Sequence, residues 1–136
     1  MLINKVMFCF SQMFGESVGV WILNEWMKMG QPSKFQLVEL GPGSGTLMTD
    51  VLRTFSRLSG QSMTDLTVQL VEISPRMRKL QQQALGVAEN IDVDSGDGGV
   101  HDCKFGCKVS WHQHVYDVPR QFSFFIGNIV ISSKTI

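Results

Sequence analysis

The stretch "VELGPGSGTL", residues 38–47, places three glycines and a proline in five consecutive positions between two apolar runs. Glycine costs backbone entropy in regular structure, so such a cluster indicates a turn that something must approach closely. The preceding "FQLVEL" (35–40) is typical of a buried strand, and the apolar spacing that follows the turn is typical of a helix. A strand, a glycine turn and a helix in this order favour a site where a nucleotide-type ligand meets a helix N-terminus.

The spacing of the turn distinguishes between kinds of ligand site. A dinucleotide-binding turn reads G-x-G-x-x-G, whereas Gly41, Gly43 and Gly45 follow one another as G-x-G-x-G. A P-loop requires Gly-Lys-Ser/Thr, which does not follow here. With Glu39 included, the pattern is acid-x-G-x-G-x-G, which is typical of methyltransferases that use S-adenosylmethionine. We therefore interpret Glu39 and the three glycines as cofactor-binding residues.

A second acidic residue supports this interpretation. The run "LTVQLVE" (66–72) is predicted to be the next strand, and it ends in Glu72. A carboxylate at that position can accept hydrogen bonds from both ribose hydroxyls of an adenosine. Glu72 lies about thirty residues beyond the turn rather than about twenty, because the intervening helix and polar break are longer than in dinucleotide-binding folds. The alternative is that Glu39 and Glu72 are ordinary solvated acids at strand ends.

The rest of the chain predicts an α/β fold. The further predicted elements are helices at 11–29, 45–58 (or 46–58) and 74–85, strands at 107–111 and 122–131, and a polar loop at 89–106. They follow from apolar periodicity and from the helix start at Ser74 and Pro75. Strands that alternate with helices predict a parallel sheet covered on both faces. We find no internal repeat or linker that would divide residues 1–136 into two domains.

The predicted sheet is small for this architecture. It has four strands, whereas a doubly wound sheet usually has about five to seven, which shield its central strands. The last predicted strand also has no element after it to cover its outer edge, and an apolar exposed edge invites association. We therefore expect an incomplete sheet that corresponds to half of a larger domain.

Composition limits the classes of partner. The formal net charge of zero removes the electrostatic case for nucleic acid or a membrane surface. No apolar run approaches the roughly 20 residues that span a bilayer. The first residues carry one Lys and no Arg, so no clear presequence is recognised. Three cysteines without framework spacing suggest a reducing compartment.

Two stretches resemble metal-binding motifs, but neither predicts a metal site. Cys103, Cys107, His101, His112 and His114 invite a zinc interpretation, but C-x3-C is wider than the usual two-residue gap and the histidine spacing fits no finger. The stretch "DVDSGDGG" (92–99) looks like the start of a calcium loop. Its register then fails, because a cysteine falls where a bidentate Glu is required, and a flexible loop fits better.

Four segments in order carry a resemblance to a known family. They are "SQMFGE" (11–16), "FQLVELGPGSGTLMTDVLR" (35–53), "VQLVEISPRMRKLQ" (68–81) and "VSWHQHVYDVP" (109–119). Together they closely resemble the MidA-like methyltransferases, and the resemblance covers residues 10–128. It implies the N-terminal half of a Rossmann-like class I methyltransferase fold that binds S-adenosylmethionine. It further implies a location in the mitochondrial matrix and symmetric dimethylation of an arginine in a core subunit of the peripheral arm of respiratory complex I, during assembly.

The resemblance also implies roles for individual residues. Gly41, Gly43 and Gly45 would line the methionine and ribose portion of the cofactor, Glu39 would orient its amino group, and Glu72 would bind the ribose. Further matches fall in a family segment that forms part of the cofactor-side wall: Ser11, Gln12, Phe14, Gly15 and Glu16. No catalytic residue is assigned.

Both ends depart from the family pattern. Residues 1–9 lack the serine, proline and glutamate that normally precede "SQMFGE". After Asn128, Ile129 and Val130 stand where the family has acids beside the reacting centre, and residues 129–136 no longer match. We expect a truncated or alternatively spliced form that does not itself turn over substrate. The alternative is a non-catalytic interaction or assembly protein that retains the cofactor-binding half.

Overall fold

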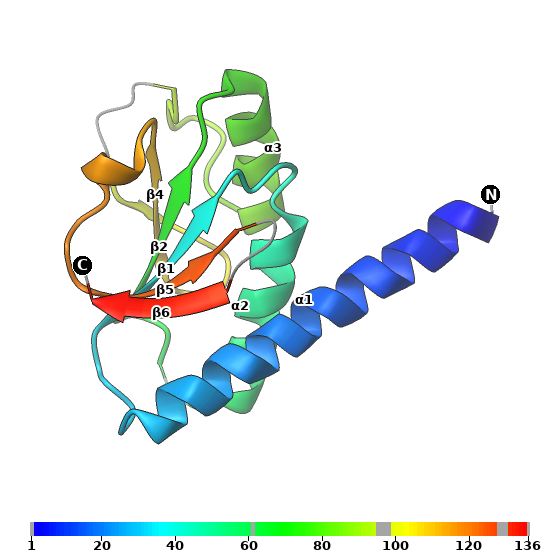
Figure 1. Cartoon of the computed structure of the whole chain (residues 1–136). Coiled ribbons are helices and arrows are strands. Elements are labelled where there is room, and N and C mark those ends of the chain that lie inside the picture. Colours follow the sequence, from blue (N-terminus) through cyan, green and yellow to red (C-terminus); the bar gives the residue numbers. More distant parts are fainter. Residues whose placement is uncertain (1, 61, 95–98, 128–130, 136) are drawn as a thin grey trace.

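The strands form one sheet in the order β3-β4-β2-β1-β5-β6 in the computed structural model, which describes residues 2–60, 62–94, 99–127 and 131–135 (Figure 1). The strands are β1 (Phe35–Leu40), β2 (Leu66–Val71), β3 (His101–Asp102), β4 (Lys108–His112), β5 (Phe122–Ile126) and β6 (Ile131–Thr135). The helices are α1 (Leu2–Lys28), α2 (Thr46–Leu58) and α3 (Pro75–Leu85), and a 3-10 turn, η1 (Val115–Asp117), follows β4. The predicted α/β class is confirmed.

The strand order creates a switch point beside β1. Strands β4, β2, β1 and β5 run parallel, and the short edge strands β3 and β6 are antiparallel to their neighbours. The chain moves in one direction from β1 to β2 to β4, and then returns to β5 on the other side of β1. In open α/β sheets, ligands bind at the carboxyl ends of the strands where the order reverses in this way.

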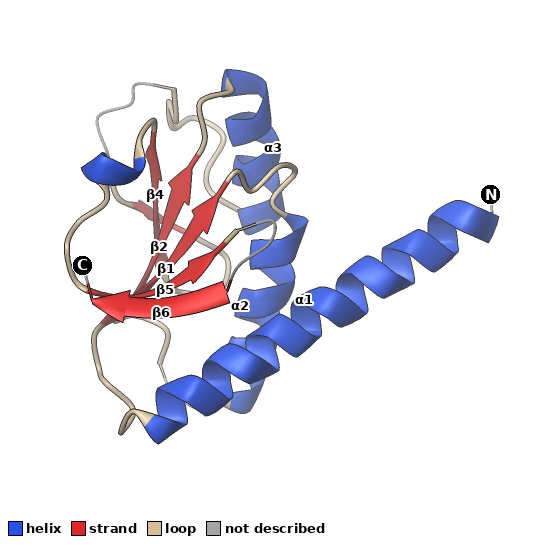
Figure 2. Cartoon of the chain, in the orientation of Figure 1, coloured by secondary structure: helices blue, strands red, loops and turns tan. Residues whose placement is uncertain are grey.

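The three α-helices of the described residues lie on one face of the sheet (Figures 1 and 2). Crossovers between parallel strands are right-handed, so two successive crossovers in the same direction place α2 and α3 on the same side. Helix α1 packs on that side too, because the Trp26 ring contacts Phe35 and Phe55 at centroid distances of 5.9 and 5.4 Å. The prediction of helices on both faces is therefore wrong for the described residues.

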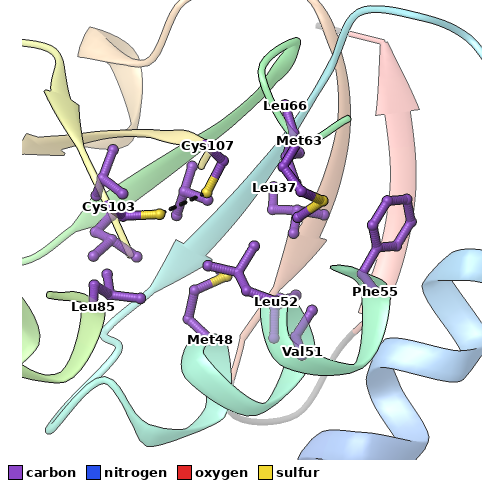
Figure 3. Packing of buried hydrophobic residues seen from close by; sticks show 14 of the residues in the cluster. Leu37, Met48, Val51, Leu52, Phe55, Met63, Leu66, Leu85, Cys103 and Cys107 are labelled. Carbon is purple, nitrogen blue, oxygen red and sulfur yellow. Dashed lines mark hydrogen bonds between the residues drawn. The ribbon is translucent and has the colours of Figure 1, made fainter. Parts of the chain in front are cut away.

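The hydrophobic core lies between this face and the helices (Figure 3). Leu37 pairs in register with Val68 on β2 and with Phe124 on β5, so the three side chains point to the same face. All three are fully buried, as are Met48 and Leu52 on α2. Because parallel strands bury a continuous apolar layer, this cluster fixes the register of the strands that carry the site.

The opposite face of the central strands carries polar side chains that hydrogen-bond to one another. Gln36 is fully buried, donates to the Ser123 hydroxyl at 2.8 Å and accepts from the Gln121 amide at 2.7 Å. On the neighbouring strands, His112 Nε2 lies 2.6 Å from Gln69 Oε1. Gln121 belongs to the connection from β4 to β5, so this connection covers part of the face without a helix.

Two predicted boundaries at the chain ends are corrected. Helix α1 begins at Leu2 rather than near Ser11, because residues 2–10 contain no Gly or Pro that would stop it. The predicted strand at 122–131 is two antiparallel strands, β5 and β6, with β5 ending before Gly127. The outer edge of β5, expected to be unpaired, is therefore paired with β6.

The predicted loop at 89–106 contains the two-residue strand β3, which pairs with β4. A strand this short leaves no periodic signal in the sequence. Apart from η1, for which no element was predicted, the remaining described elements agree with the prediction to within one or two residues. None of the helices in the described ranges combines the length and apolar character that a membrane crossing requires.

Candidate functional site

The glycine turn follows β1 at the switch point. Gly41, Gly43 and Gly45 all have positive φ angles, of 65°, 58° and 83°, which L side chains rarely adopt. A Cβ added at Gly41 or Gly43 would meet no atom within 4 Å, whereas one at Gly45 would lie 3.1 Å from the Gln81 Cα. The first two glycines therefore border open space at the carboxyl end of the sheet, and the third allows α2 to pack closely against α3.

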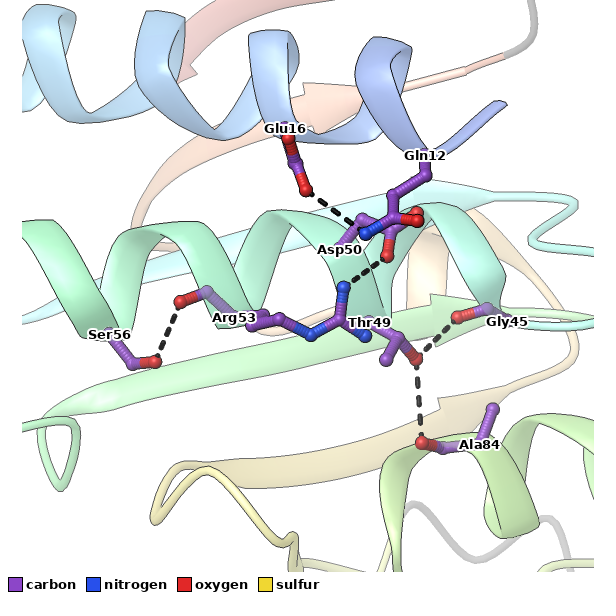
Figure 4. Close-up of polar contacts among 8 residues, drawn as sticks. All are labelled: Gln12, Glu16, Gly45, Thr49, Asp50, Arg53, Ser56 and Ala84. Atoms are coloured by element: carbon purple, nitrogen blue, oxygen red, sulfur yellow. Dashed lines mark hydrogen bonds and ion pairs between the residues drawn. The ribbon is translucent and has the colours of Figure 1, made fainter. Parts of the chain in front are cut away.

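Helix α2 begins directly at this turn. Its N-cap residue, Gly45, has no side chain to cap the first turn, and Thr49 on the next turn donates its hydroxyl to the Gly45 carbonyl at 2.8 Å (Figure 4). The N-terminus of a helix carries partial positive charge and backbone N–H donors. The turn thus presents these donors to a ligand at the edge of the sheet.

Glu39 lies near the end of β1 and points toward the helix side of the sheet, since it pairs in register with Leu70 and Ile126. It is 4% exposed, and its Oε2 is buried without a hydrogen-bond partner. Burial raises the pKa of Glu39 from 4.5 to about 7. A buried carboxylate oxygen without a partner is a rare arrangement, and it suits a cationic or N–H-bearing ligand group.

Glu72 follows directly after β2, and its carboxylate is held at both oxygens. Oε1 accepts a hydrogen bond from the Ser74 backbone N–H at 3.0 Å, and Oε2 accepts one from the Gln81 amide at 3.3 Å. The Glu72 backbone carbonyl accepts from Arg78 Nε at 2.7 Å. These contacts fix the orientation of the carboxylate at the same edge as the glycine turn.

Gln81 connects the predicted site residues, and sequence analysis did not identify it. This fully buried α3 side chain donates to the Gly43 carbonyl at 2.7 Å and to Glu72, and it accepts from Trp111 Nε1 at 2.9 Å. The sequence did contain a signal. Arg78, Gln81 and Gln82 share a helical stripe with the buried Leu85, and polar residues on a core-facing stripe indicate a hydrogen-bonded role.

The "SQMFGE" segment lies against α2. A Cβ at Gly15 would come 2.5 Å from the Asp50 Cβ, so only glycine allows α1 to approach this closely. Gln12 donates to Glu16 at 3.2 Å, beside the Asp50–Arg53 ion pair (Figure 4). Phe14 is 59% exposed. The side chain of Ser11, and residues 128–130, lie outside the described part of the structure.

Fold and site together define an α/β domain with a mostly parallel sheet, of the class that binds nucleoside-type cofactors at the carboxyl edge of the sheet. A family model described as a putative S-adenosyl-L-methionine-dependent methyltransferase matches residues 17–133, and the chain belongs to this family. The cofactor of the family is S-adenosylmethionine, which confirms the cofactor that the sequence predicted.

Similar proteins carry a more specific name. The chain is 44% identical over 124 residues to the mitochondrial protein arginine methyltransferase NDUFAF7 of Xenopus tropicalis and 40% identical over 125 residues to that of Homo sapiens. It is 39% identical over 123 residues to the mitochondrial homolog of Drosophila melanogaster. Each match covers 87% of this chain but only 27–28% of the relative, so the chain spans less than a third of their length. The mitochondrial location in these names agrees with the resemblance.

The residues present fit this cofactor. S-adenosylmethionine carries an amino group and a ribose, and the site offers a partnerless buried carboxylate oxygen on Glu39, a fixed carboxylate on Glu72 and open space at Gly41 and Gly43. In the described residues, no group of three or more His, Cys, Asp or Glu side chains is arranged to hold a metal ion.

Replacing Glu39 should change how stability depends on pH. The unfolded chain releases the Glu39 proton near pH 4.5 and the folded chain near pH 7. The folded state thus binds more protons between these values, so the free energy of unfolding falls as pH rises through this window, by about 3 kcal/mol. Glu39→Gln removes this loss. Urea unfolding at about pH 5 and about pH 8 should show the variant gaining stability relative to wild type as pH rises.

Glu89→Gln, at an exposed acid outside the site, serves as the control and should leave the pH dependence unchanged. Parallel pH curves for wild type and Glu39→Gln would show that Glu39 does not titrate in this window.

Removing the Gln81 amide should destabilise the fold. Gln81→Leu leaves the buried Trp111 indole N–H and the Gly43 carbonyl without their partner, which should lower the free energy of unfolding by about 1–3 kcal/mol. Gln83→Leu, at an exposed position on the same helix, should change it by less than about 0.5 kcal/mol. Urea denaturation measures both, and equal losses would contradict the bridging role of Gln81.

Proposed function

We propose that the chain is the cofactor-binding part of a mitochondrial protein arginine methyltransferase. The proposed activity is symmetric dimethylation of an arginine in a core subunit of the peripheral arm of respiratory complex I, during assembly of the complex. Family membership and the names of the relatives support an arginine methyltransferase. The observation that carries the proposal is the placement of Glu39, the glycine turn and Glu72 at one edge of the sheet, beside the switch point.

Each residue at this edge has a proposed role. Glu39 would bind the amino group of S-adenosylmethionine through its partnerless carboxylate oxygen, and Glu72 would accept hydrogen bonds from the ribose. Gly41, Gly43 and Gly45 would line the methionine and ribose portion. When bound, the cofactor supplies an electrophilic methyl group on its sulfonium. The residues of this chain bind and orient it.

Methyl transfer to arginine requires, besides the bound cofactor, a correctly placed guanidinium. The guanidinium must be held about 3 Å from the methyl group, and carboxylates must hold its charge. In the family such acids follow the position of Asn128, where this chain has Ile129 and Val130. The proposal is therefore that this chain binds the cofactor and does not by itself methylate arginine.

A non-catalytic interaction or assembly role is the second candidate. Helix α1 carries several exposed apolar side chains, including Met13 at 62% and Met27 at 53%. Exposed apolar side chains of this kind suit contact with another protein or another part of a larger assembly. If this second candidate function holds, the chain retains the cofactor-binding residues at the carboxyl edge of the sheet but takes part in no methyl transfer.

Cofactor binding is tested by calorimetric titration of S-adenosylmethionine into the purified chain. Binding to one site is expected, and Glu72→Gln should weaken it by about tenfold or more, because a charged hydrogen-bond acceptor is worth about 1.5–3 kcal/mol. Glu89→Gln should leave the affinity unchanged. If the chain is folded by circular dichroism and releases no binding heat, the proposal of a cofactor site is wrong.

Methyl transfer is tested with S-adenosylmethionine labelled on its methyl group and the purified complex I subunit. The chain alone should leave arginine unlabelled, while a full-length relative labels it in parallel. Label on arginine from the chain alone would contradict the proposed inactivity, and it would also exclude the purely non-catalytic candidate.

A further inference from the structure

Two cysteines meet across the hairpin that joins β3 and β4. Cys103 follows β3 and Cys107 precedes β4, and their sulfur atoms lie 2.9 Å apart (Figure 3). Both are free thiols. Because Cys107 comes before β4, the pair lies at the amino ends of the parallel strands, at the edge opposite to the glycine turn. The proposed methyltransferase function gives these thiols no role.

The backbone holds the two cysteines in the geometry of a bridgeable pair. The register of β3 and β4 places Cys103 directly opposite Cys107, and the Cys103 N–H donates to the Cys107 carbonyl at 3.1 Å. Directly opposed residues of antiparallel strands have Cα atoms about 4.5–5.5 Å apart, within the range of about 4.4–6.8 Å found for disulfides. The sulfurs are about 0.9 Å farther apart than in a disulfide bond. A small side-chain movement closes this gap.

The hairpin is anchored against the core, which keeps the pair together. The Lys104 N–H donates to the Leu85 carbonyl at the end of α3 at 3.0 Å, and the Gly106 N–H donates to the Cys103 carbonyl at 3.1 Å. Neither cysteine belongs to a group that could hold a metal ion among the described residues. The geometry therefore suits a bond between the two sulfurs better than a shared ligand.

The two thiols differ in access and in acidity. Cys103 is 8% exposed, whereas Cys107 is fully buried. Hydrogen bonds from the Cys107 thiol and from backbone N–H groups of the turn lower the pKa of Cys103, and the same thiol contact together with burial raises the pKa of Cys107. The thiolate is the reactive form of cysteine, so the greater access of Cys103 and the direction of its pKa shift favour it as the nucleophile of the pair.

We infer that Cys103 and Cys107 form a redox modification site, at which a small hydroperoxide converts the two thiols into a reversible intramolecular disulfide. The Cys103 thiolate attacks one peroxide oxygen, the O–O bond breaks, and the leaving oxygen departs as water after taking a proton. The Cys107 sulfur then attacks the sulfur of the resulting sulfenic acid, the S–O bond breaks, and a second water leaves with the Cys107 proton. Two thiols are oxidised by two electrons, and hydrogen peroxide is reduced to two waters.

The test uses the full chain, reduced, treated with hydrogen peroxide, alkylated and digested with trypsin. Trypsin cleaves after Lys104 and separates the two cysteines, so only a disulfide keeps peptides 80–104 and 105–108 together. Mass spectrometry should find the joined peptides, lighter by two hydrogen atoms than the reduced pair, and a dithiol reductant should separate them. Alkylation of both thiols after peroxide treatment would overturn the inference, and so would bridges to Cys9 or between two chains.

Single variants test the order of attack. Cys107→Ser should leave Cys103 as a sulfenic acid that dimedone traps, at a rate roughly ten times or more that of Cys107 in Cys103→Ser. Circular dichroism tests whether each variant is folded. If one variant does not fold, the peptide map of the wild-type chain still tests whether the disulfide forms. Equal trapping in the two variants would contradict the assignment of Cys103 as nucleophile. Stoichiometric zinc bound to the reduced chain would instead assign the thiols to a metal.

Discussion

The buried amide of Gln81 joins the three segments on which the cofactor edge depends. Its NH₂ group reaches the carbonyl of the glycine turn and the Glu72 carboxylate, and its oxygen accepts the Trp111 indole N–H. These groups come from β1, β2, β4 and their following turns, so one side chain on α3 sets their spacing. A buried amide with its hydrogen bonds made is rigid, because each broken bond leaves a polar group without water. The positions of the turn and of Glu72 are thus coupled.

Burial of Glu39 at the carboxyl edge of the sheet lowers the stability of the folded chain. Its carboxylate is buried among apolar neighbours with one oxygen lacking a partner, and the raised pKa expresses the resulting penalty on the charged form. A chain selected for stability alone would place an apolar residue there. The arrangement is reasonable where a positively charged group of a ligand provides the missing partner, as we propose for the amino group of S-adenosylmethionine.

The elements around the glycine turn were predictable because their signals are local. A few adjacent residues suffice to predict β1, the turn, α2 and the helix start at Ser74 and Pro75. Glu39 and Glu72 are local signals too, because each lies at the end of a predicted strand. The helical stripe of α3 indicates that Gln81 is buried and hydrogen-bonded, but it does not indicate the partner, because Gly43 lies about forty residues away in sequence. The one-sided placement of the helices was missed for a related reason. It follows from strand order, and the return of the chain from β4 to β5 across β1 is a long-range choice.

The polar layer on the face of the sheet opposite to the α-helices determines how much cover that face requires. Gln36, Ser123 and Gln121 satisfy one another's hydrogen bonds, and His112 is paired with Gln69. An apolar layer in the same place would require another structural layer to cover it. A layer of mutually paired amides and hydroxyls has a weaker requirement, because these groups exchange protein partners for water at little net change in free energy. Water that reaches this side of the sheet can therefore replace a protein partner at little cost, so the layer tolerates a cover as thin as the connection from β4 to β5.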